Sequence, residues 1–421
     1  MASPLVLVTG VSGYIGQWVA YYALQAGYRV RGTVRSAARG AGLVDAIAPP
    51  GAAHRLELVE ADLLSSAGWD AAVAGCAYVL HVASPFVLDE PKDEQVLIRP
   101  AVEGTLAVLR ACAAAQPPPR RVVVTSSVAA VAYGSDKPAS HVFTEEDWTN
   151  PSGKGVGAYI KSKCLAERAA WDFVRALPAG SAFELATVNP VMVLGPALGR
   201  ESASGSLSVI EKFFTSNVPG FPKLPMNFVV SVGRARAHTR SRQESSHPAH
   251  SHRHPTTHHP PLPTQDVRDV ALLHLAAMRS PQAAGRRFIA SGTSSTLDQL
   301  GPPLGAAFKP HGFRVVSSTL PTWLLSVSSL FLKDAALALR NMRSPTITSS
   351  AAAVQLVGGG FAFNANAGQL AVDLAMSCVA AGLIEDKSKG LVLSKGRSED
   401  AVRAAATPPP HPFLKQFSCS E

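Results

Sequence analysis

The first thirty residues hold the feature that most constrains the fold, a glycine-rich turn between two apolar segments. Residues 5–9 form an apolar run of strand length, and residues 14–26 are long and apolar enough for a helix that ends at Gly27. Between them, Gly10, Gly13 and Gly16 have the spacing GxxGxxG. Small residues in such a turn let the backbone approach a pyrophosphate, and the helix N-terminus attracts the anion. The sequence therefore predicts a dinucleotide-binding site at the N-terminus.

Strand-like and helical segments then alternate along the chain. Strands are predicted over 28–34, 56–60, 78–82, 121–125 and 184–188, and helices over 67–74, 95–115 and 158–176. Apolar strands that lack a polar face and are separated by helices are typical of a parallel sheet covered on both sides. The predicted fold class is α/β, a Rossmann-type doubly wound parallel sheet.

Beyond residue 195 the alternation fades, and the predicted domains follow from this change. A helix over 267–278, a strand over 287–290 and a helix over 365–381 indicate a smaller C-terminal substrate lobe. We expect a nucleotide-binding core over 1–195 and a lobe with some returning core elements over 196–385. Residues 386–421 are charged, Pro-rich and weakly periodic, so a flexible tail is expected there.

The composition excludes several other classes of protein. With 421 residues, 47% of them apolar and 16% charged, the chain can bury a full core and is neither collagen-like nor disordered throughout. Its five cysteines are widely spaced without a CxxC pair, so neither a disulfide scaffold nor a metal site is expected. The apolar run over 323–332 is too short to cross a bilayer, and the glycine turn begins too early for a signal peptide. We therefore expect a soluble, cytoplasmic protein.

The net charge of +9 and the 13 histidines come in large part from residues 230–265. This stretch holds seven histidines, five arginines and five prolines but no Phe, Tyr or Trp. It has too little apolar surface to offset the entropy of ordering, and a structureless loop of this length is uncommon inside a domain. Metal binding by the histidines or nucleic-acid binding by the arginines is an alternative, but the histidines lack a regular ligand spacing. We expect a disordered insertion, and neither nucleic acid nor a membrane as a partner.

The end of the second predicted strand indicates which dinucleotide binds. A site selective for NAD carries an acidic residue about 20 residues after the glycines, where it holds the ribose 2′-hydroxyl. Here Arg31 and Arg35 occupy this region, and no carboxylate does. A guanidinium suits a 2′-phosphate in charge and in the fork of its donors, so NADPH is favoured over NADH. The alternative is that both arginines are solvated surface charges. Asp62, after the third strand, stands where it could contact the adenine.

Tyr159 and Lys163 form the pattern YxxxK, which places them one turn apart on one face of a helix. A phenol has an ordinary pKa near ~10, and a neighbouring ammonium lowers that pKa. Ser127 follows the strand 121–125 and offers a hydroxyl where open α/β sheets bind their ligands. Alone, YxxxK is a common surface pair. Together with the glycine turn, these groups suit hydride transfer to a carbonyl carbon, with Tyr159 as proton donor and Ser127 hydrogen-bonded to the oxygen.

These motifs jointly resemble the extended short-chain dehydrogenases/reductases of the NAD-dependent epimerase/dehydratase superfamily. Within them the chain is most similar to the group of dihydroflavonol reductase, cinnamoyl-CoA reductase and the fungal aldehyde (methylglyoxal) reductases. The matching stretches are 8–18, 28–35, 81–86, 100–104, 122–127, 159–171, 183–196 and 266–270, which cover most of residues 5–290.

The resemblance implies a catalytic triad of Ser127, Tyr159 and Lys163 and the cofactor NADPH/NADP+, with Arg35 at the 2′-phosphate. It also implies that Val82 and Ala83 lie along the cofactor and that Asn189 and Pro190 border the nicotinamide. The predicted cofactor contacts are Gly10, Gly13, Tyr14, Ile15, Gly16, Arg35, Asp62, Leu63, Val82, Ala83 and Pro190. His81 is expected to be a packed strand residue rather than a ligand.

The resemblance also explains the odd segment. In this family a pattern like Phe-Val-Asp-Val-Arg-Asp leads from a strand into a helix, and here its halves end at Val229 and begin at Asp266. Joining them restores the pattern in frame. Val230-Ser231 can be encoded by GTGAGT, a splice-donor sequence, and Gln265 by CAG, a splice acceptor. Our hypothesis is that residues 230–265 are translated from a retained intron, or result from a misassigned exon boundary, and do not form a functional module.

The leading function is therefore NADPH-dependent reduction of a small carbonyl substrate, an aldehyde or a ketone. A 3β-hydroxysteroid dehydrogenase or a sugar-nucleotide epimerase would use the same triad, and only the substrate lobe would distinguish them. A non-catalytic NADP-binding redox sensor is the alternative from another class, but a sensor has no need of Ser127, Tyr159 and Lys163. The motifs identify neither the particular substrate nor the oligomeric state.

Overall fold

The structure is a computed structural model of the protein. It describes residues 3–40, 42–85, 91–138, 140–178, 183–199, 205–215, 220–222, 230–231, 263–294, 296–321, 323–324, 347–364, 366–384 and 413–419.

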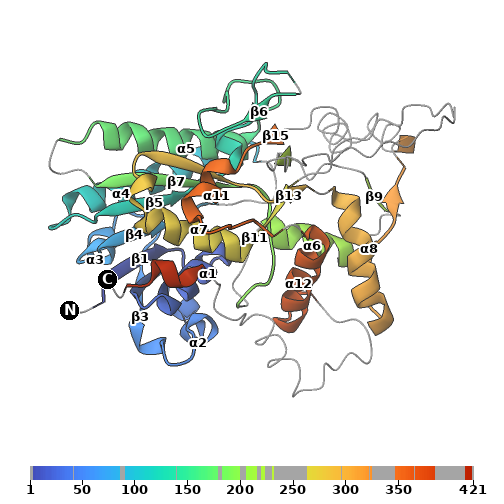
Figure 1. Cartoon of the computed structure of the whole chain (residues 1–421), viewed down its shortest axis with the longest axis horizontal. Coiled ribbons are helices and arrows are strands. Elements are labelled where there is room, and N and C mark those ends of the chain that lie inside the picture. Colours follow the sequence, from blue (N-terminus) through green and yellow to red (C-terminus); the bar gives the residue numbers. More distant parts are fainter. Residues whose placement is uncertain are drawn as a thin grey trace, which may run out of the picture.

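A seven-stranded parallel sheet forms the centre of the molecule (Figure 1). Its strand order is β12-β7-β5-β4-β1-β2-β3, and every neighbouring pair is parallel. The strands are β1 (Leu5–Thr9), β2 (Arg29–Val34), β3 (Leu56–Glu60), β4 (Tyr78–His81), β5 (Arg121–Thr125), β7 (Glu184–Pro190) and β12 (Arg286–Ala290). The order of addition reverses between β1 and β4, which is where α/β sheets bind their ligands. The predicted doubly wound sheet is confirmed.

Helices cover both faces of this sheet, because each strand points apolar side chains to both sides. Val6 and Val8 of β1 belong to one buried cluster with α1 and α7, whereas Leu5 and Leu7 belong to a second cluster with α3, α4 and α5. The helices of the core are α1 (Tyr14–Gln25), α2 (Leu43–Ile47), α3 (Trp69–Val73), α4 (Gln95–Ala114), α5 (Ala158–Arg175), α7 (Val267–Arg279) and α11 (Ala351–Val357). The alternation of side chains along the strands thus produces the layered core.

A smaller C-terminal lobe lies beside the sheet (Figure 1). It contains α6 (Gly205–Thr215), α8 (Leu297–Phe308) and α12 (Ala367–Ala380). Leu304 of α8 and Leu370 of α12 are fully buried in the cluster that also covers the sheet, so core and lobe share one apolar interior. Short strands form three smaller sheets with the orders β10-β15-β6, β13-β11-β8 and β14-β9. They are β6 (Val142–Phe143), β8 (Val193–Leu194), β9 (Phe221–Pro222), β10 (Val230–Ser231), β11 (Pro263–Asp266), β13 (Thr293–Ser294), β14 (Thr319–Leu320) and β15 (Ile347–Thr348).

Both ends of the stretch 230–265 pair with other strands. β10 pairs in parallel with β15, and β11 pairs in parallel with β8 and antiparallel with β13. Residues 263–265 therefore form the strand that leads into α7. Residues 232–262 lie outside the described residues, so the proposed origin of this stretch stays a prediction.

The C-terminal residues 413–419 differ from the expected flexible tail over 386–421. Leu414 and Phe417 are buried in the main cluster, and the backbone N–H of Cys419 donates to the carbonyl of Ala26 at 3.0 Å. Gln416 Nε2 donates to the carbonyl of Val357 at 2.9 Å. Two large apolar side chains three residues apart thus dock this segment on the core. The other residues of the expected tail lie outside the described part of the chain.

The strand predicted over 184–188 is two residues too short, because β7 continues to Pro190. Pro190 lies opposite Ala290 of β12, whereas the pairing of β7 with β5 ends at Val188. A proline has no N–H to donate, and at this position, past the end of β5, none is needed.

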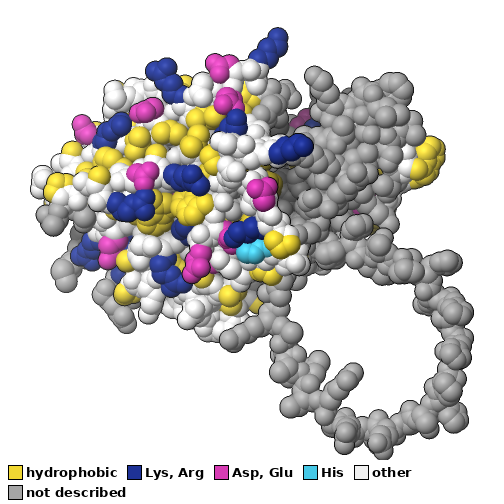
Figure 2. All heavy atoms as spheres, turned by 90° about the horizontal axis from the view of Figure 1, so that it is seen from above, with side chains coloured by type: hydrophobic (Ala, Val, Ile, Leu, Met, Phe, Trp, Pro, Cys, Tyr) yellow, Lys and Arg dark blue, Asp and Glu magenta, His cyan; other side chains and the backbone are white. Residues whose placement is uncertain are grey.

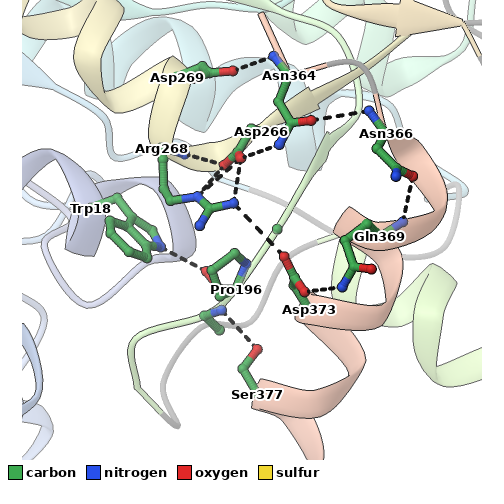
Figure 3. Close-up of polar contacts among 12 residues, drawn as sticks. Trp18, Pro196, Asp266, Arg268, Asp269, Asn364, Asn366, Gln369, Asp373 and Ser377 are labelled. Carbon is green, nitrogen blue, oxygen red and sulfur yellow. Dashed lines mark hydrogen bonds and ion pairs between the residues drawn. The ribbon is translucent and has the colours of Figure 1, made fainter. Parts of the chain in front are cut away.

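A polar cluster after the odd stretch joins the core to the lobe (Figure 3). Asp266 is 3% exposed, accepts a hydrogen bond from the backbone N–H of Arg268 and so caps α7. Its carboxylate also pairs with the guanidinium of Arg268 at 2.6 Å and accepts from Asn364 Nδ2 at 3.1 Å. Asp269 accepts from the backbone N–H of Asn364 at 2.8 Å. The motif at 266–270 thus fixes α7 to the segment that precedes α12.

The same cluster reaches α1 through the segment after β8 (Figure 3). Trp18 Nε1 donates to the carbonyl of Pro196 at 2.8 Å, and the backbone N–H of Ala197 donates to Ser377 Oγ of α12 at 2.9 Å. These contacts join α12 of the lobe to α1 through the segment that follows β8.

The surface that Figure 2 shows carries Lys and Arg side chains interspersed with Asp and Glu. No helix within the described residues is both long enough and apolar enough to span a membrane. In the same part of the chain, no group of three or more His, Cys, Asp or Glu side chains could hold a metal ion.

We predict that Asp266→Ala lowers the free energy of unfolding by about 3 kcal/mol, because it removes a helix cap and the nearer carboxylate of Arg268, whose other ion-pair partner, Asp373, lies 3.9 Å away. Urea unfolding measures the change. The matched control is Asp172→Ala, which removes a carboxylate that pairs with Arg175 on an exposed helix face and should cost under about 1 kcal/mol. Equal losses for the two variants would contradict the role of Asp266.

Candidate active site

The turn between β1 and α1 requires glycine at two positions. Gly10 has a φ of +63°, and a Cβ there would lie 2.9 Å from Cβ of Ala83, which follows β4. A Cβ at Gly16 would lie 2.4 Å from the carbonyl oxygen of Gly10. The backbone N–H of Gly10 donates to Thr33 Oγ1 at 2.9 Å, which ties the turn to β2. The turn therefore lies directly against the ends of β2 and β4.

The N-terminus of α1 fits a bound anion. Its first residue follows Gly13, and the helix has neither a side-chain cap nor an acidic residue in its first turn. A Cβ at Gly13 would have one neighbour within 4 Å, the carbonyl oxygen of Gly10 at 3.2 Å. Free N–H groups at a helix N-terminus, beside backbone without side chains, are what a pyrophosphate requires. The residues of this turn thus fit a dinucleotide.

Two of the residues predicted for the cofactor lie at the end of β4. The backbone N–H of Ala83 donates to Thr9 Oγ1 at 3.0 Å, and Thr9 Oγ1 also bonds His81 Nδ1 at 2.9 Å. These bonds hold Val82 and Ala83 next to the glycine turn. His81 is buried, and burial together with the charge of Lys163 lowers its pKa to about 4, so it is neutral at pH 7. It therefore serves as a packed partner of Thr9.

The side chain of Tyr14 is held away from the glycine turn. Its hydroxyl donates to the carbonyl of Gly195 at 2.6 Å, and the ring is 4% exposed. Burial raises its pKa well above the usual value. Only the backbone of Tyr14 is left for an anion, whereas Ile15 is partly buried beside it in the core.

Arg31 and Arg35 of the β2 region have different surroundings. Arg31 pairs with Glu57 at 2.7 Å and donates to three carbonyls at the end of α3, those of Ala71, Ala72 and Ala74. Arg35 follows β2, is exposed, and has no ion-pair partner within the described residues. Of the two guanidinium groups, that of Arg35 is therefore the one available to a ligand.

Asp62 and Leu63 follow β3, the strand next to β2. Asp62 Oδ1 accepts from the backbone N–H of Leu64 at 2.9 Å and shapes the turn. Leu63 lies under α4, where a Cβ at Gly104 would be 2.8 Å from Cβ of Leu63. Both residues therefore lie at the same edge of the sheet as Arg35, one strand further out.

Ser127 and Tyr159 meet in front of β5. Ser127 comes two residues after the strand, is 8% exposed, and its Oγ accepts from the backbone N–H of Ala129 at 3.1 Å. Tyr159 is the second residue of α5 and is hydrogen-bonded to the side chain of Ser127. The predicted pair of hydroxyl groups is thus in direct contact.

Lys163 lies one turn further along α5. Its Nζ is 5.8 Å from the ring centre of Tyr159 and donates to Ser84 Oγ at 2.7 Å. Burial lowers its pKa from 10.5 to about 8. Ser84, which we did not predict, is thus the partner of this lysine. Its position directly after Val82 and Ala83 is the sequence signal that could have identified it.

The pKa of Tyr159 differs from the expectation that Lys163 would lower it. Burial raises the pKa of this phenol, and only the hydrogen bond with Ser127 acts in the opposite direction. The phenol therefore keeps its proton at neutral pH. A group in this state can give a proton, whereas it would accept one poorly.

Asn189 and Pro190 close the site from the side of β7. Asn189 is fully buried and donates to the carbonyl of Ser127 at 3.2 Å. The strand ends of β1, β4, β5 and β7 thus bring the glycine turn, Ala83, Ser127 and Pro190 to one edge of the sheet.

Comparison with known proteins places this geometry in context. The model of the NAD dependent epimerase/dehydratase family matches residues 6–218. Cinnamoyl-CoA reductase CAD2 of Medicago truncatula is 38% identical over 248 residues, 58% of this chain and 73% of that protein. Dihydroflavonol 4-reductase of Zea mays is 38% identical over 223 residues, 51% of this chain and 60% of that protein.

A solved structure covers more of the fold. Gre2 from Candida albicans in complex with NADPH is 25% identical in sequence and superposes with a TM-score of 0.65. The match covers 90% of this chain and 99% of that one. The similarity therefore extends beyond the sheet into the C-terminal lobe.

Proposed function

The chain belongs to the NAD dependent epimerase/dehydratase family, and on this premise we propose that it is an NADPH-dependent carbonyl reductase. The proposed substrate is an aldehyde or a ketone: the name of dihydroflavonol 4-reductase points to a ketone, whereas that of cinnamoyl-CoA reductase points to a thioester carbonyl. The observation that carries the proposal is the contact between Ser127 and Tyr159, with Lys163 one turn away, beside a turn that fits a dinucleotide.

NADPH is the proposed cofactor, and it supplies the hydride. The turn at Gly10, Gly13 and Gly16 would hold its pyrophosphate, and Arg35 its 2′-phosphate. Asp62 and Leu63 would border the adenosine end. Val82, Ala83 and Pro190 would line the path toward Ser127 and Tyr159.

The three polar side chains divide the work on the substrate. Ser127 and Tyr159 donate hydrogen bonds to the carbonyl oxygen, which polarises the bond and orients its carbon. As the oxygen gains negative charge, Tyr159 transfers its proton to it, so the carbonyl becomes an alcohol and the phenol a phenolate. For its charge to stabilise this phenolate, the ammonium of Lys163 must lie closer to the phenol than it does when bonded to Ser84. Lys163 must leave Ser84 or share its donors to reach a cofactor ribose at the same time.

Other functions of the family would use the same side chains. A 3β-hydroxysteroid dehydrogenase or a sugar-nucleotide epimerase differs in the substrate lobe, and the named relatives favour a reductase over both. A non-catalytic NADP-binding sensor is disfavoured by the buried contact between Ser127 and Tyr159, because sensing requires no proton donor next to the hydride site.

We predict that the purified protein oxidises NADPH in the presence of at least one substrate from a panel of aldehydes, dihydroflavonols, cinnamoyl thioesters and ketosteroids. Tyr159→Phe should lower kcat by roughly 10²- to 10⁴-fold, because it removes the proton donor. Absorbance at 340 nm follows the reaction. If Tyr159→Phe retains full activity, the phenol is not the donor and the mechanism is wrong.

Selectivity for the cofactor should depend on Arg35 and not on Arg31. Arg35→Ala removes a charged contact worth about 1.5–3 kcal/mol, so we expect roughly 10- to 100-fold weaker NADPH binding and unchanged NADH binding. Arg31→Ala is the matched control, since Arg31 is held by Glu57 and three carbonyls. It should lower the thermal stability and leave the ratio of the two affinities unchanged. Fluorescence titration measures the affinities for NADPH and NADH. A shift in their ratio for Arg31→Ala would count against the assignment of the 2′-phosphate to Arg35.

The pH dependence should report Lys163. Its pKa of about 8 lies below the ordinary value, so it is charged at pH 7 and loses its proton as the pH rises through about 8. We predict that kcat/KM for NADPH, which follows groups of the free enzyme, declines above pH 8. Lys163→Arg keeps its charge and should remove this decline, even if the rate is lower. Lys161 lies on α5 like Lys163 and pairs with Glu94, which precedes α4; Lys161→Met breaks this ion pair and should leave the profile unchanged.

A further inference from the structure

Glu167 is a buried carboxylate that the proposed mechanism does not use. It lies on α5 four residues after Lys163 and eight after Tyr159, so all three occupy one side of the helix. Its side chain is 1% exposed. The donors to its carboxylate are Ser126 Oγ at 2.5 Å, Asn189 Nδ2 at 2.7 Å, Thr187 Oγ1 at 3.1 Å, Trp171 Nε1 at 3.2 Å and Arg287 Nε at 2.6 Å.

The guanidinium of Arg287 keeps Glu167 ionised. Burial raises the pKa of this carboxyl, but the charge and hydrogen bond of Arg287, together with the hydrogen bonds of Ser126 and Trp171, outweigh that effect and hold the pKa below its usual value. Arg287 also donates to the carbonyls of Glu145 and Asp147 at 2.8 and 2.6 Å, and its guanidinium lies 3.8 Å from the ring of Trp148. A buried ion pair with all its hydrogen bonds made is rigid, because breaking any part leaves a charge unpaired.

Two of these bonds lead directly to the active-site serine. Ser126 is the chain neighbour of Ser127, and its hydroxyl is held by Glu167 Oε2. Asn189 Nδ2 donates both to Glu167 Oε2 and to the carbonyl of Ser127. The backbone at Ser127 is therefore attached to the carboxylate on both sides of its Cα.

This attachment matters because Glu167 and Tyr159 belong to the same helix. A helix is stiff over two turns, so whatever is fixed to Glu167 keeps its place relative to Tyr159. A displacement of about 1 Å at a reacting group can cost roughly 10²-fold in rate. The position of Ser127 Oγ relative to the phenol of Tyr159 thus depends on the buried contacts of Glu167.

We propose that Glu167 is a positioning residue that holds Ser127 against Tyr159, acting through Ser126 and Asn189. This inference rests on the proposed function, in which Ser127 and Tyr159 bind and protonate the substrate oxygen. A purely structural ion pair is the competing explanation. It would affect stability, but it would not act on turnover through Ser127.

Two single substitutions separate the explanations. Ser126→Ala and Trp171→Phe each remove one donor to Glu167 and leave its ion pair with Arg287 intact. Of these two donors, only Ser126 is connected to Ser127. We expect Ser126→Ala to lower kcat by roughly 10-fold or more with KM for NADPH unchanged, and Trp171→Phe to leave kcat within about twofold. Measurements 20 °C or so below the lower melting temperature exclude effects of unfolding.

A double-mutant cycle then tests the route. If Glu167 acts through Ser127, adding Ser126→Ala to Ser127→Ala costs no further kcat, because the group to be positioned is gone. Multiplied losses would overturn the proposal. Ser127→Ala alone also tests the proposed function, since a variant with unchanged kcat would refute the role of Ser127 itself, whatever Glu167 does.

Hydrogen exchange supplies a readout that needs no substrate. The amide of Ala129 donates to Ser127 Oγ, so its exchange rate reports how well that hydroxyl is held. In the full-length protein we expect faster exchange of this amide in Ser126→Ala and an unchanged rate in Trp171→Phe. Equal rates in the wild type and Ser126→Ala would overturn the proposal.

Discussion

The turn from β1 into α1 can pass between its neighbours only because Gly10 and Gly16 carry no side chain. Gly10 lies against Ala83 and Gly16 against the carbonyl of Gly10, so the two contacts set the height of α1 above the sheet. They also set the distance between the helix N-terminus and the end of β4. Ser84, the partner of Lys163, follows Ala83 directly. The turn that would hold the cofactor is therefore connected to Lys163 of α5 through Ala83 and Ser84.

Helix α5 connects the buried core to the candidate active site. Tyr159, Lys163 and Glu167 follow one another on this helix at intervals of four residues. The first lies next to Ser127, and the last forms the buried ion pair with Arg287. The charge of Lys163 is partly desolvated, which lowers its pKa, whereas that of Glu167 is fully compensated by Arg287. Because the ion pair of Glu167 with Arg287 anchors α5, the helix can hold the partly desolvated ammonium of Lys163 in position. The anchor needs a partner from β12, more than a hundred residues further along the chain.

This separation decides what could be predicted from the sequence. The sheet, the glycine turn and the contact between Ser127 and Tyr159 follow from local patterns and from the rule that parallel strands end at one edge. Tyr14 could not be placed, because its direction depends on the carbonyl of Gly195. Nor could Arg31 be told from Arg35: the register of β2 against β3 brings Glu57 to Arg31 and ends before Arg35. Each of these depends on a partner that lies far away in the sequence.

The strand before α7 is a case in which the residue composition predicted no structure, although a strand forms there. Residues 263–265 belong to the stretch 230–265, which has too few apolar residues to be expected in a folded core. Even so, β11 pairs with β8 through Gln265 and Asp266. Backbone hydrogen bonds make a strand ladder, so they place little demand on the side chains. Asp266, in contrast, is demanded by its contacts, because it caps α7, pairs with Arg268 and binds Asn364. The joint between core and lobe thus depends on the side chain of Asp266, the first residue after the odd stretch.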